Sequence, residues 1–128
     1  MKILILDDDD FRHQVFAENL TGHSVTHTRN SAEFFNALGK EQFDIVFLDH
    51  DLGDIVFDPY KREITGTHVA QGMVDKLDKI PKCVIHSWNP SGAQRMRSIL
   101  SRKCQFIIVS PFSGAITWFE NILSTFGN

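Results

Sequence analysis

Short apolar runs that end in polar residues are the feature that most constrains the fold of this chain. Three such runs lie at residues 2–6, 43–48 and 83–85, and each leads directly into an aspartate or a histidine. Nearly continuous apolar runs of this length are typical of parallel strands that are buried on both faces. Their carboxyl ends share one edge of the sheet, and ligands bind at that edge in open α/β folds. The sequence therefore predicts one site that collects these polar side chains.

The rest of the chain alternates between strand-like and helix-like segments joined by short connections. Strands are expected at about residues 2–6, 23–28, 43–48, 82–86 and 105–109. Helices are expected at about residues 10–20, 31–39, 66–78, 89–100 and 113–126, with Ser31 as the cap of the second. This alternation predicts an α/β fold in which helices cover both faces of a parallel sheet. The segment from Gly53 to Thr67 interrupts the pattern and is expected to be a long loop at the ligand edge, a lid or specificity element.

Length and composition limit the function classes. The 128 residues are 42% apolar and are expected to form a single domain, residues 1–128. The net charge of −3 and the absence of a longer Lys/Arg run exclude a surface for duplex nucleic acid, while a small phosphorylated ligand remains compatible. Cys83 and Cys104 are expected to be free thiols. The apolar run before the first aspartate is only four residues long, so we expect a cytoplasmic protein with no signal peptide and no contact with a membrane.

Clustered aspartates predict a metal site. Asp7 and Asp8 follow the first strand, and Asp49 follows the third. Carboxylates gathered at one edge repel each other, and a divalent cation with oxygen ligands compensates their charge. We therefore expect Mg²⁺ or Mn²⁺ bound by these three side chains, with Asp51 and its backbone carbonyl completing the site.

The residues after this aspartate pair open the first helix and allow two interpretations. Asp9 and Asp10 either join the acidic site or cap and charge the first helical turn, which the helix dipole favours. Arg12 and His13 either contact a substrate phosphate or are solvated helix residues.

Two histidines are candidates for acid–base chemistry, because imidazole titrates near neutrality. His50 follows Asp49 directly and is expected either to act as an acid, base or substrate donor or to be hydrogen-bonded to its own loop. His86 is a candidate proton donor to a leaving oxygen, with a packed structural histidine as the alternative.

The segment after His86 predicts an anion site. Asn89 and Pro90 are typical of a helix start, where unpaired N–H groups and the helix dipole attract an anion. Ser87 is expected to donate its hydroxyl to a phosphoryl oxygen, and the small residues Ser91 and Gly92 are expected to let a phosphate come close. The alternative is that Asn89 and Ser91 are only helix caps.

Together these features resemble the receiver domain of response regulators over almost the whole chain. The resemblance implies a flavodoxin-like three-layer α/β/α sandwich with a five-stranded parallel sheet in the order 2-1-3-4-5. It assigns Asp7 and Asp8 to the metal-binding acidic pair, Asp49 to the phosphoacceptor and Ser87 to the switch hydroxyl. The chain departs from receivers at the end of the fifth strand, where Ser110 replaces the lysine that contacts the phosphoryl group.

A narrower group fits the motifs better. The chain resembles the cyclic-phosphate processing receiver domain in three motifs. These are Asp-Asp-Asp with Arg12-His13, the segment from Leu48 to Gly53 and the segment from His86 to Ala93. This resemblance implies action on cyclic nucleotides or on cyclic phosphate ends of RNA.

The leading hypothesis is a metal-dependent phosphoesterase that opens a cyclic phosphodiester. His86 or His50 would supply the acid or base, Ser87 and Asn89 would stabilise the added negative charge, and Asp49 would bind the metal or attack as a nucleophile. The alternative is a non-catalytic receiver-like module, in which Asp49 accepts a phosphoryl group or the pocket retains a nucleotide.

Overall fold

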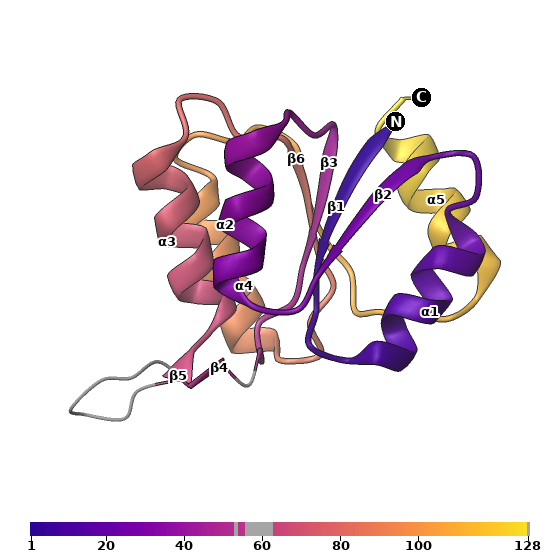
Figure 1. Cartoon of the computed structure of the whole chain (residues 1–128), viewed down its shortest axis with the longest axis horizontal. Helices are drawn as coiled ribbons and strands as arrows, with labels where there is room; N and C mark the ends of the chain where they lie inside the picture. Colours follow the sequence, from indigo (N-terminus) through magenta and orange to yellow (C-terminus); the bar gives the residue numbers. More distant parts are fainter. Residues whose placement is uncertain (53, 56–62, 128) are drawn as a thin grey trace.

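The core of the molecule is a five-stranded parallel sheet with helices on both faces (Figure 1). The computed structural model describes residues 1–52, 54–55 and 63–127. The sheet contains β1 (Lys2–Leu6), β2 (Ser24–Thr28), β3 (Ile45–Leu48), β6 (Lys82–Ile85) and β7 (Ile107–Val109). Their order is β2-β1-β3-β6-β7, and every neighbouring pair is parallel. This order confirms the predicted flavodoxin-like sandwich.

Five helices form the two outer layers: α1 (Asp10–Asn19), α2 (Ser31–Lys40), α3 (Gly66–Lys76), α4 (Pro90–Leu100) and α5 (Ile116–Thr125). Figure 1 shows α1 and α5 on one face of the sheet and α2, α3 and α4 on the other. The predicted cap of α2 was wrong by one residue, because the side chain of Asn30, not Ser31, accepts a hydrogen bond from the N–H of Glu33. Helix α5 also begins later than residue 113.

Each face of the sheet has its own apolar core, because successive side chains of a strand point to opposite faces. In β1, Ile3 and Ile5 pack with α1 and α5, while Leu4 and Leu6 pack with α2, α3 and α4. Four phenylalanines are among the largest buried side chains, and Phe16 of α1 contacts the rings of Phe47 and Phe119. Burial on both faces explains why the strands appear in the sequence as almost unbroken apolar runs.

The segment between β3 and α3 is only partly the long loop that the sequence predicts. Its described ends form two short strands, β4 (Asp54–Ile55) and β5 (Glu63–Ile64), which pair in antiparallel fashion. The remainder of the predicted lid, residues 53 and 56–62, lies outside the described residues.

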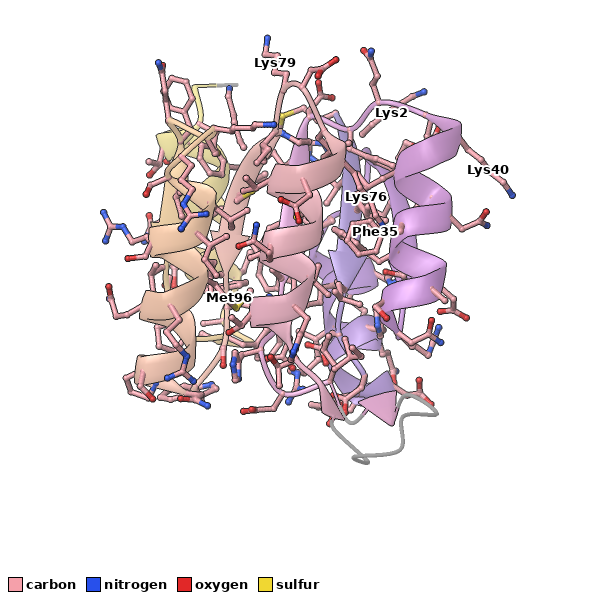
Figure 2. The ribbon with its side chains drawn as sticks, turned by 90° about the vertical axis from the view of Figure 1, so that its left-hand side faces the viewer. Lys2, Phe35, Lys40, Lys76, Lys79 and Met96 are labelled. Carbon is pink, nitrogen blue, oxygen red and sulfur yellow. The ribbon has the colours of Figure 1, made fainter. Side chains whose placement is uncertain are left out.

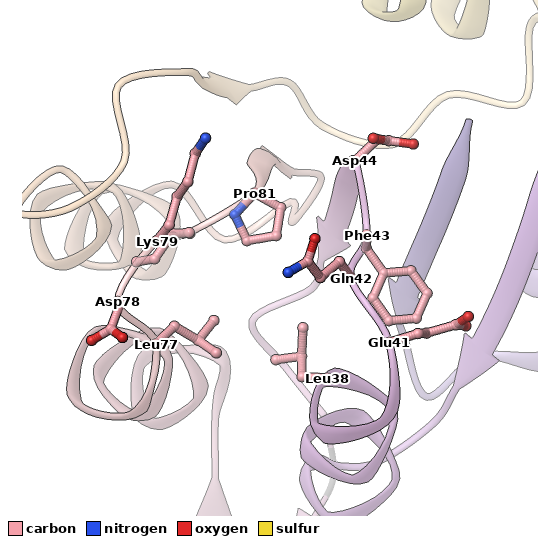
Figure 3. Close-up of a pocket in the computed structure, with 10 residues that line it drawn as sticks. Leu38, Glu41, Gln42, Phe43, Asp44, Leu77, Asp78, Lys79 and Pro81 are labelled. Atoms are coloured by element: carbon pink, nitrogen blue, oxygen red, sulfur yellow. The ribbon is translucent and has the colours of Figure 1, made fainter.

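The end of the molecule at the amino ends of the strands has exposed lysines and an open pocket. Figure 2 shows Lys2 and Lys79 at this end of the molecule, and Lys76 of α3 against Phe35 of α2, with its Nζ atom 4.2 Å from the ring centroid. An open pocket of about 520 Å³ lies here, between the last turns of α2 and α3, with Leu38 and Pro81 among its lining residues (Figure 3). It lies at the end of the sheet opposite the aspartates that follow β1 and β3.

Within the described part of the chain, none of the helices is long and apolar enough to cross a membrane.

Candidate functional site

Three buried ionisable side chains meet at the carboxyl edge of the sheet. Asp7 follows β1, Asp49 follows β3 and His86 follows β6, and they are 0%, 6% and 1% exposed. One ligand atom of each lies within 4.8 Å of the others. The β1/β3 boundary is where the strand order reverses, which is the usual position of a ligand crevice in this type of sheet. The structure thus brings together residues from three of the segments that the sequence singled out.

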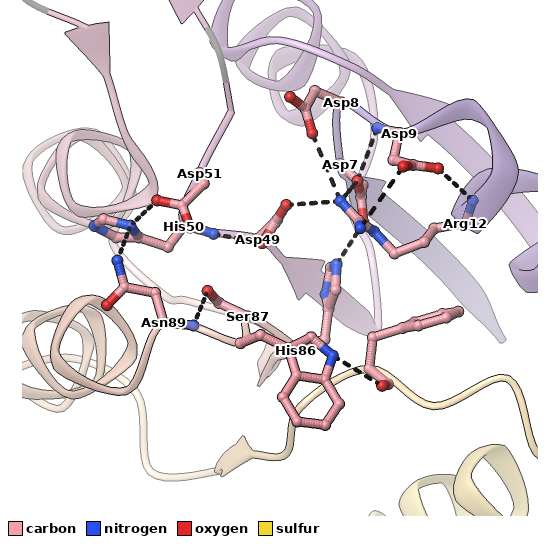
Figure 4. A network of polar contacts seen from close by, with 12 residues as sticks. Asp7, Asp8, Asp9, Arg12, Asp49, His50, Asp51, His86, Ser87 and Asn89 are labelled. Atoms are coloured by element: carbon pink, nitrogen blue, oxygen red, sulfur yellow. Dashed lines mark hydrogen bonds and ion pairs between the residues drawn. The ribbon is translucent and has the colours of Figure 1, made fainter.

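Arg12 connects these carboxylates. Its Nε atom lies 2.7 Å from Asp7 Oδ2 and its Nη2 atom lies 2.7 Å from Asp7 Oδ1, a two-pronged ion pair (Figure 4). The same Nη2 atom lies 3.3 Å from Asp49 Oδ2 and 3.6 Å from Asp8 Oδ1. The planar guanidinium fork matches the geometry of a carboxylate, so this pairing is both strong and directional. An internal cation therefore sits among the carboxylates that the sequence assigned to a metal ion.

The pKa values of the aspartates differ because their partners differ. Burial opposes ionisation of Asp7, but hydrogen bonds from His86 and Arg12 outweigh it and hold the pKa of Asp7 well below its ordinary value. Burial raises the pKa of Asp49, and repulsion by Asp7 adds to this increase although His86 and Arg12 oppose it. Burial and the charge of Asp7 also raise the pKa of Asp8. Asp7 is thus the charged anchor of the site, whereas ionisation of Asp49 costs the folded protein stability.

His86 lies beneath the carboxylates rather than beside an open cleft. Its Nε2 atom is 2.8 Å from Asp7 Oδ2, and its ring contacts Phe16, Phe47 and Phe112. Its Nδ1 atom is buried and has no hydrogen-bond partner among the described residues. The aromatic packing fixes the ring so that one nitrogen faces Asp7.

His50 also makes internal contacts. Its Nδ1 atom lies 2.9 Å from Asp51 Oδ1 and 3.3 Å from Asn89 Nδ2. The ring fills the space beside Gly92, where an added Cβ would come within 2.6 Å of it. The sequence assigned that space to a phosphate, but in the structure the His50 ring occupies it. This packing explains why a residue without a side chain is required at Gly92.

Two other predicted phosphate ligands lie differently from the expectation. His13 points behind β1, where its Nε2 atom is 2.7 Å from the backbone oxygen of Asp7 and its Nδ1 atom is 2.7 Å from His27 Nδ1. It is therefore a buried support of the strand end and not a solvated helix residue, because the helix turns this side chain inward; a phosphate contact of His13 stays a prediction. Ser91 donates its hydroxyl to Asn89 Oδ1, which also accepts the N–H of Gly92. Asn89 and Ser91 thus form the cap of α4.

The remaining predicted residues lie around the site. Ser87 is buried, and its Oγ atom accepts the N–H of Asn89. Asp8 borders the cluster, whereas the side chain of Asp51 points to His50 and is mostly exposed. Asp9 caps α1 by accepting the N–H of Arg12, as the second interpretation of that residue proposed.

Arg12 has one role that we did not expect from the sequence. We expected it to be a substrate contact or a solvated helix residue, whereas it is the counter-ion of Asp7 and Asp49. A signal was available in the sequence, because Arg12 stands four residues after Asp8, a spacing that puts both on one side of the chain at a helix start. Ser110, at the position of the receiver lysine, accepts a hydrogen bond from Trp118 Nε1 of α5.

The donor set fits a hard cation. Asp7, Asp8 and Asp49 offer carboxylate oxygens, the ligands that Mg²⁺ and Mn²⁺ prefer. Both oxygens of Asp7 already accept bonds from Arg12, so an ion that binds Asp7 competes with the guanidinium for these oxygens.

Asp49→Asn is expected to raise the melting temperature at pH 7 in the absence of metal. The raised pKa of Asp49 means that its charged form is disfavoured in the folded state, and the amide removes that charge. The gain is expected to shrink as the pH falls through this raised pKa, because the wild-type carboxyl is then protonated. Thermal melts over a pH series, with and without Mg²⁺, measure both effects.

Asp44→Asn is the matched control for this variant, because Asp44 stands at the other end of β3 and accepts the N–H of Lys2. If Mg²⁺ binds the acidic cluster, the melting temperature should rise with Mg²⁺ in the wild type and in Asp44→Asn but not in Asp8→Asn or Asp49→Asn. An equal Mg²⁺ response in all of these proteins would exclude the cluster as the metal site.

Comparison with solved structures gives receiver domains of low sequence identity. A CheY-like response regulator receiver domain from Methylobacillus flagellatus has a TM-score of 0.69 and 19% identity and covers 98% of both chains. The response regulator TrrA from Thermotoga maritima, in complex with Mg(2+)-BeF, has a TM-score of 0.70 and 16% identity and covers 98% of this chain and 97% of its own. NtrX from Brucella abortus, in complex with ADP, has a TM-score of 0.66 and 20% identity, and the match spans 98% of this chain but 27% of NtrX. These similarities show the fold.

Sequence comparison identifies the family. A search of curated proteins found no significant match. The family model of the cyclic-phosphate processing receiver domain matches residues 2–102, which include the ends of β1, β3 and β6 that supply the site. The chain is therefore a receiver domain of the response-regulator type, and it belongs to the cyclic-phosphate processing receiver domain family.

Proposed function

We propose that this receiver domain binds a small phosphorylated ligand, in particular one with a cyclic phosphate, at the carboxyl edge of its sheet without turning it over. The family description points to the ligand class. The observation that carries the proposal is that both candidate acid–base histidines, His50 and His86, are buried and hydrogen-bonded within the protein.

A catalytic acid or base has to come within hydrogen-bond distance of the proton that it transfers, roughly 2.6–3.2 Å. His86 presents one nitrogen to Asp7 and packs its ring against phenylalanines, and His50 is bonded to Asp51 beside Gly92. Neither imidazole reaches an external phosphoester without breaking these contacts. A binding module requires no such movement.

Arg12 is the group best placed to meet the ligand. Asp7 fixes its guanidinium beside Asp49, and 29% of the side chain is exposed. A phosphoryl group that approaches this edge meets the exposed part of the Arg12 side chain, beside the cap of α4 that Asn89 and Ser91 form. Mg²⁺ held by Asp7, Asp8 and Asp49 would add positive charge toward the phosphoryl oxygens. The Mg(2+)-BeF complex of TrrA is consistent with such a metal in a receiver of this fold.

The second candidate is the metal-dependent phosphoesterase. The 2.8 Å contact between His86 and Asp7 favours it, because a carboxylate that orients an imidazole is a common arrangement in acid–base catalysis. In this version His86 becomes accessible when ligand binds; water attacks the phosphorus, one P–O ester bond of the ring breaks, and His86 protonates the leaving oxygen.

Titration calorimetry beside a chromatographic product assay distinguishes the two candidates. The ligand panel contains cyclic mono- and dinucleotides and RNA with a 2′,3′-cyclic phosphate end, each with Mg²⁺, Mn²⁺ or EDTA. We expect binding of at least one ligand and its recovery intact, and product formation would overturn the binding proposal. If product forms, His86→Ala should reduce turnover by roughly 10²–10⁴-fold with affinity nearly unchanged.

Lasting phosphorylation of Asp49 is not expected. Ser110 is bonded to Trp118 at the position where receivers place a lysine, so the cation that holds a phosphoryl group on the aspartate is missing there. After incubation with acetyl phosphate and Mg²⁺, intact-mass spectrometry should show the unmodified protein. A stable adduct of one phosphoryl group that is lost in Asp49→Asn would instead support a signalling receiver.

A further inference from the structure

Trp88 is an exposed aromatic residue at the edge of the proposed ligand site. Its exposed fraction is 72%, whereas the other tryptophan, Trp118, is packed among Phe16, Phe47 and Phe119. Single exposed apolar residues are common and need no functional explanation. Trp88 points to a ligand because it lies beside the proposed site and because a hydrogen bond holds its indole in place.

The indole of Trp88 is held in place. Its Nε1 atom donates a hydrogen bond to the backbone oxygen of Phe112 at 3.1 Å. The backbone around it is also fixed, because the N–H of Asn89 bonds to Ser87 Oγ and Pro90 begins α4. Since the only polar atom of the ring is engaged, the surface that remains exposed is apolar. A restrained apolar ring surface loses little conformational entropy when a flat ligand stacks on it.

The ring stands between two residues of the phosphate-binding edge. Ser87 precedes it and directly follows His86, and Asn89 follows it and lies 3.3 Å from His50, the residue after Asp49. In a nucleotide, the sugar separates the base from the phosphate. A phosphate at this edge therefore leaves its base within reach of a ring that lies one residue away. Stacking accepts every base, because each has a π-face.

We propose that Trp88 is a stacking platform for a nucleobase, so that the ligand of the site is a nucleotide or an RNA end rather than a base-free phosphate. This inference rests on the proposed function of the site and names the class of its ligand. Arg12 holds the phosphate, and Trp88 holds the base.

The test compares two ligands that differ in the base. Titration calorimetry with 2′,3′-cyclic AMP and with glycerol 1,2-cyclic phosphate is performed on the wild type, Trp88→Ala and Trp88→Phe. Trp88→Ala is expected to weaken binding of 2′,3′-cyclic AMP by about tenfold or more and to leave the base-free ligand unchanged, in line with alanine substitution at stacked bases. Trp88→Phe keeps a ring but loses the bond to Phe112, and it should retain most of the affinity.

Phe106→Ala is the matched control, because Phe106 is an exposed aromatic residue near Lys82 at the amino end of the strands. It should bind both ligands as the wild type does. Equal affinity of Trp88→Ala and wild type for 2′,3′-cyclic AMP would overturn the stacking role while the binding function stands. Failure of the wild type to bind either ligand would overturn both proposals.

Discussion

Arg12→Ala is expected to lower the free energy of unfolding by about 3 kcal/mol at pH 7, the lower end of the cost of leaving one buried charge without its partner. Asp7 is fully buried and receives both prongs of the guanidinium, so truncation removes two charge-assisted hydrogen bonds at once. The bond to His86 and the N–H of Asp9 remain, which limits the loss. Urea denaturation followed by circular dichroism measures the difference.

The pH dependence of this loss has a definite sign. The pKa of Asp7 in the folded protein is lowered from its ordinary value of 3.8, so its ion pair stabilises the protein fully above that value. The stabilisation disappears as the pH falls through the lowered pKa and Asp7 takes up a proton. The wild type and Arg12→Ala should therefore differ most near neutrality and converge in strong acid.

Arg29→Ala is the matched control for the arginine. Arg29 bonds to Asp10 at 2.6 Å, but this pair lies on the surface, where water screens the charges, and its removal should change stability little. If the free energy of unfolding falls equally little in Arg12→Ala and Arg29→Ala, the contacts of Arg12 do not stabilise the protein. Double replacement with Asp7→Asn should recover part of the loss in Arg12→Ala, because the buried charge is then gone.

Gly66→Ala is expected to destabilise the protein by about 2–3 kcal/mol, in the upper part of the range for overpacked positions. An added Cβ would lie 2.4 Å from the backbone oxygen of Asp49 and 2.8 Å from the Cα atom of His50. Neither is a flexible side-chain end, and the N–H of Gly66 also bonds to the oxygen of His50 at 2.7 Å. The start of α3 must therefore move away from the strand end that carries Asp49.

Gly39→Ala provides the comparison, because Gly39 lies in α2 and no atom is within 4 Å of its added Cβ. There the methyl group should be neutral or stabilising, by up to about 1 kcal/mol, since alanine is the better helix former. Thermal melts of the two variants, with ligand titrations in parallel, separate a general glycine effect from the clash. Equal stability of the two variants would show that the contact around Gly66 is loose enough to adapt.

The sequence predicted the strand ends well for a physical reason. A strand buried on both faces tolerates few polar residues, so the change from Leu6 to Asp7 and from Leu48 to Asp49 marks the edge of the sheet closely. The directions of the side chains beyond those ends were much less predictable. Arg12 and His13 are neighbours in the first turn of α1, yet one faces the acidic cluster and the other turns behind β1.

Two further features depended on contacts between distant segments. Gly92 is required by the ring of His50, and no local pattern in either segment reveals that these residues touch. Ser110 was recognised as a departure from receivers, but its bond to Trp118 depends on how α5 packs against the sheet. Local sequence limits which residues reach the site, and tertiary packing decides which atoms point into it.

The tethering of Arg12 sets a competition at this edge. Arg12 is only five residues from Asp7 in the same chain. The effective concentration of its guanidinium at Asp7 is therefore constant, whereas occupancy by a free ion depends on the concentration of that ion. A divalent cation that binds Asp7 competes with this tethered group, so its apparent dissociation constant includes the free energy of weakening the Arg12–Asp7 ion pair. Arg12→Ala removes the competing guanidinium, so this variant should saturate its acidic cluster at a lower Mg²⁺ concentration than the wild type.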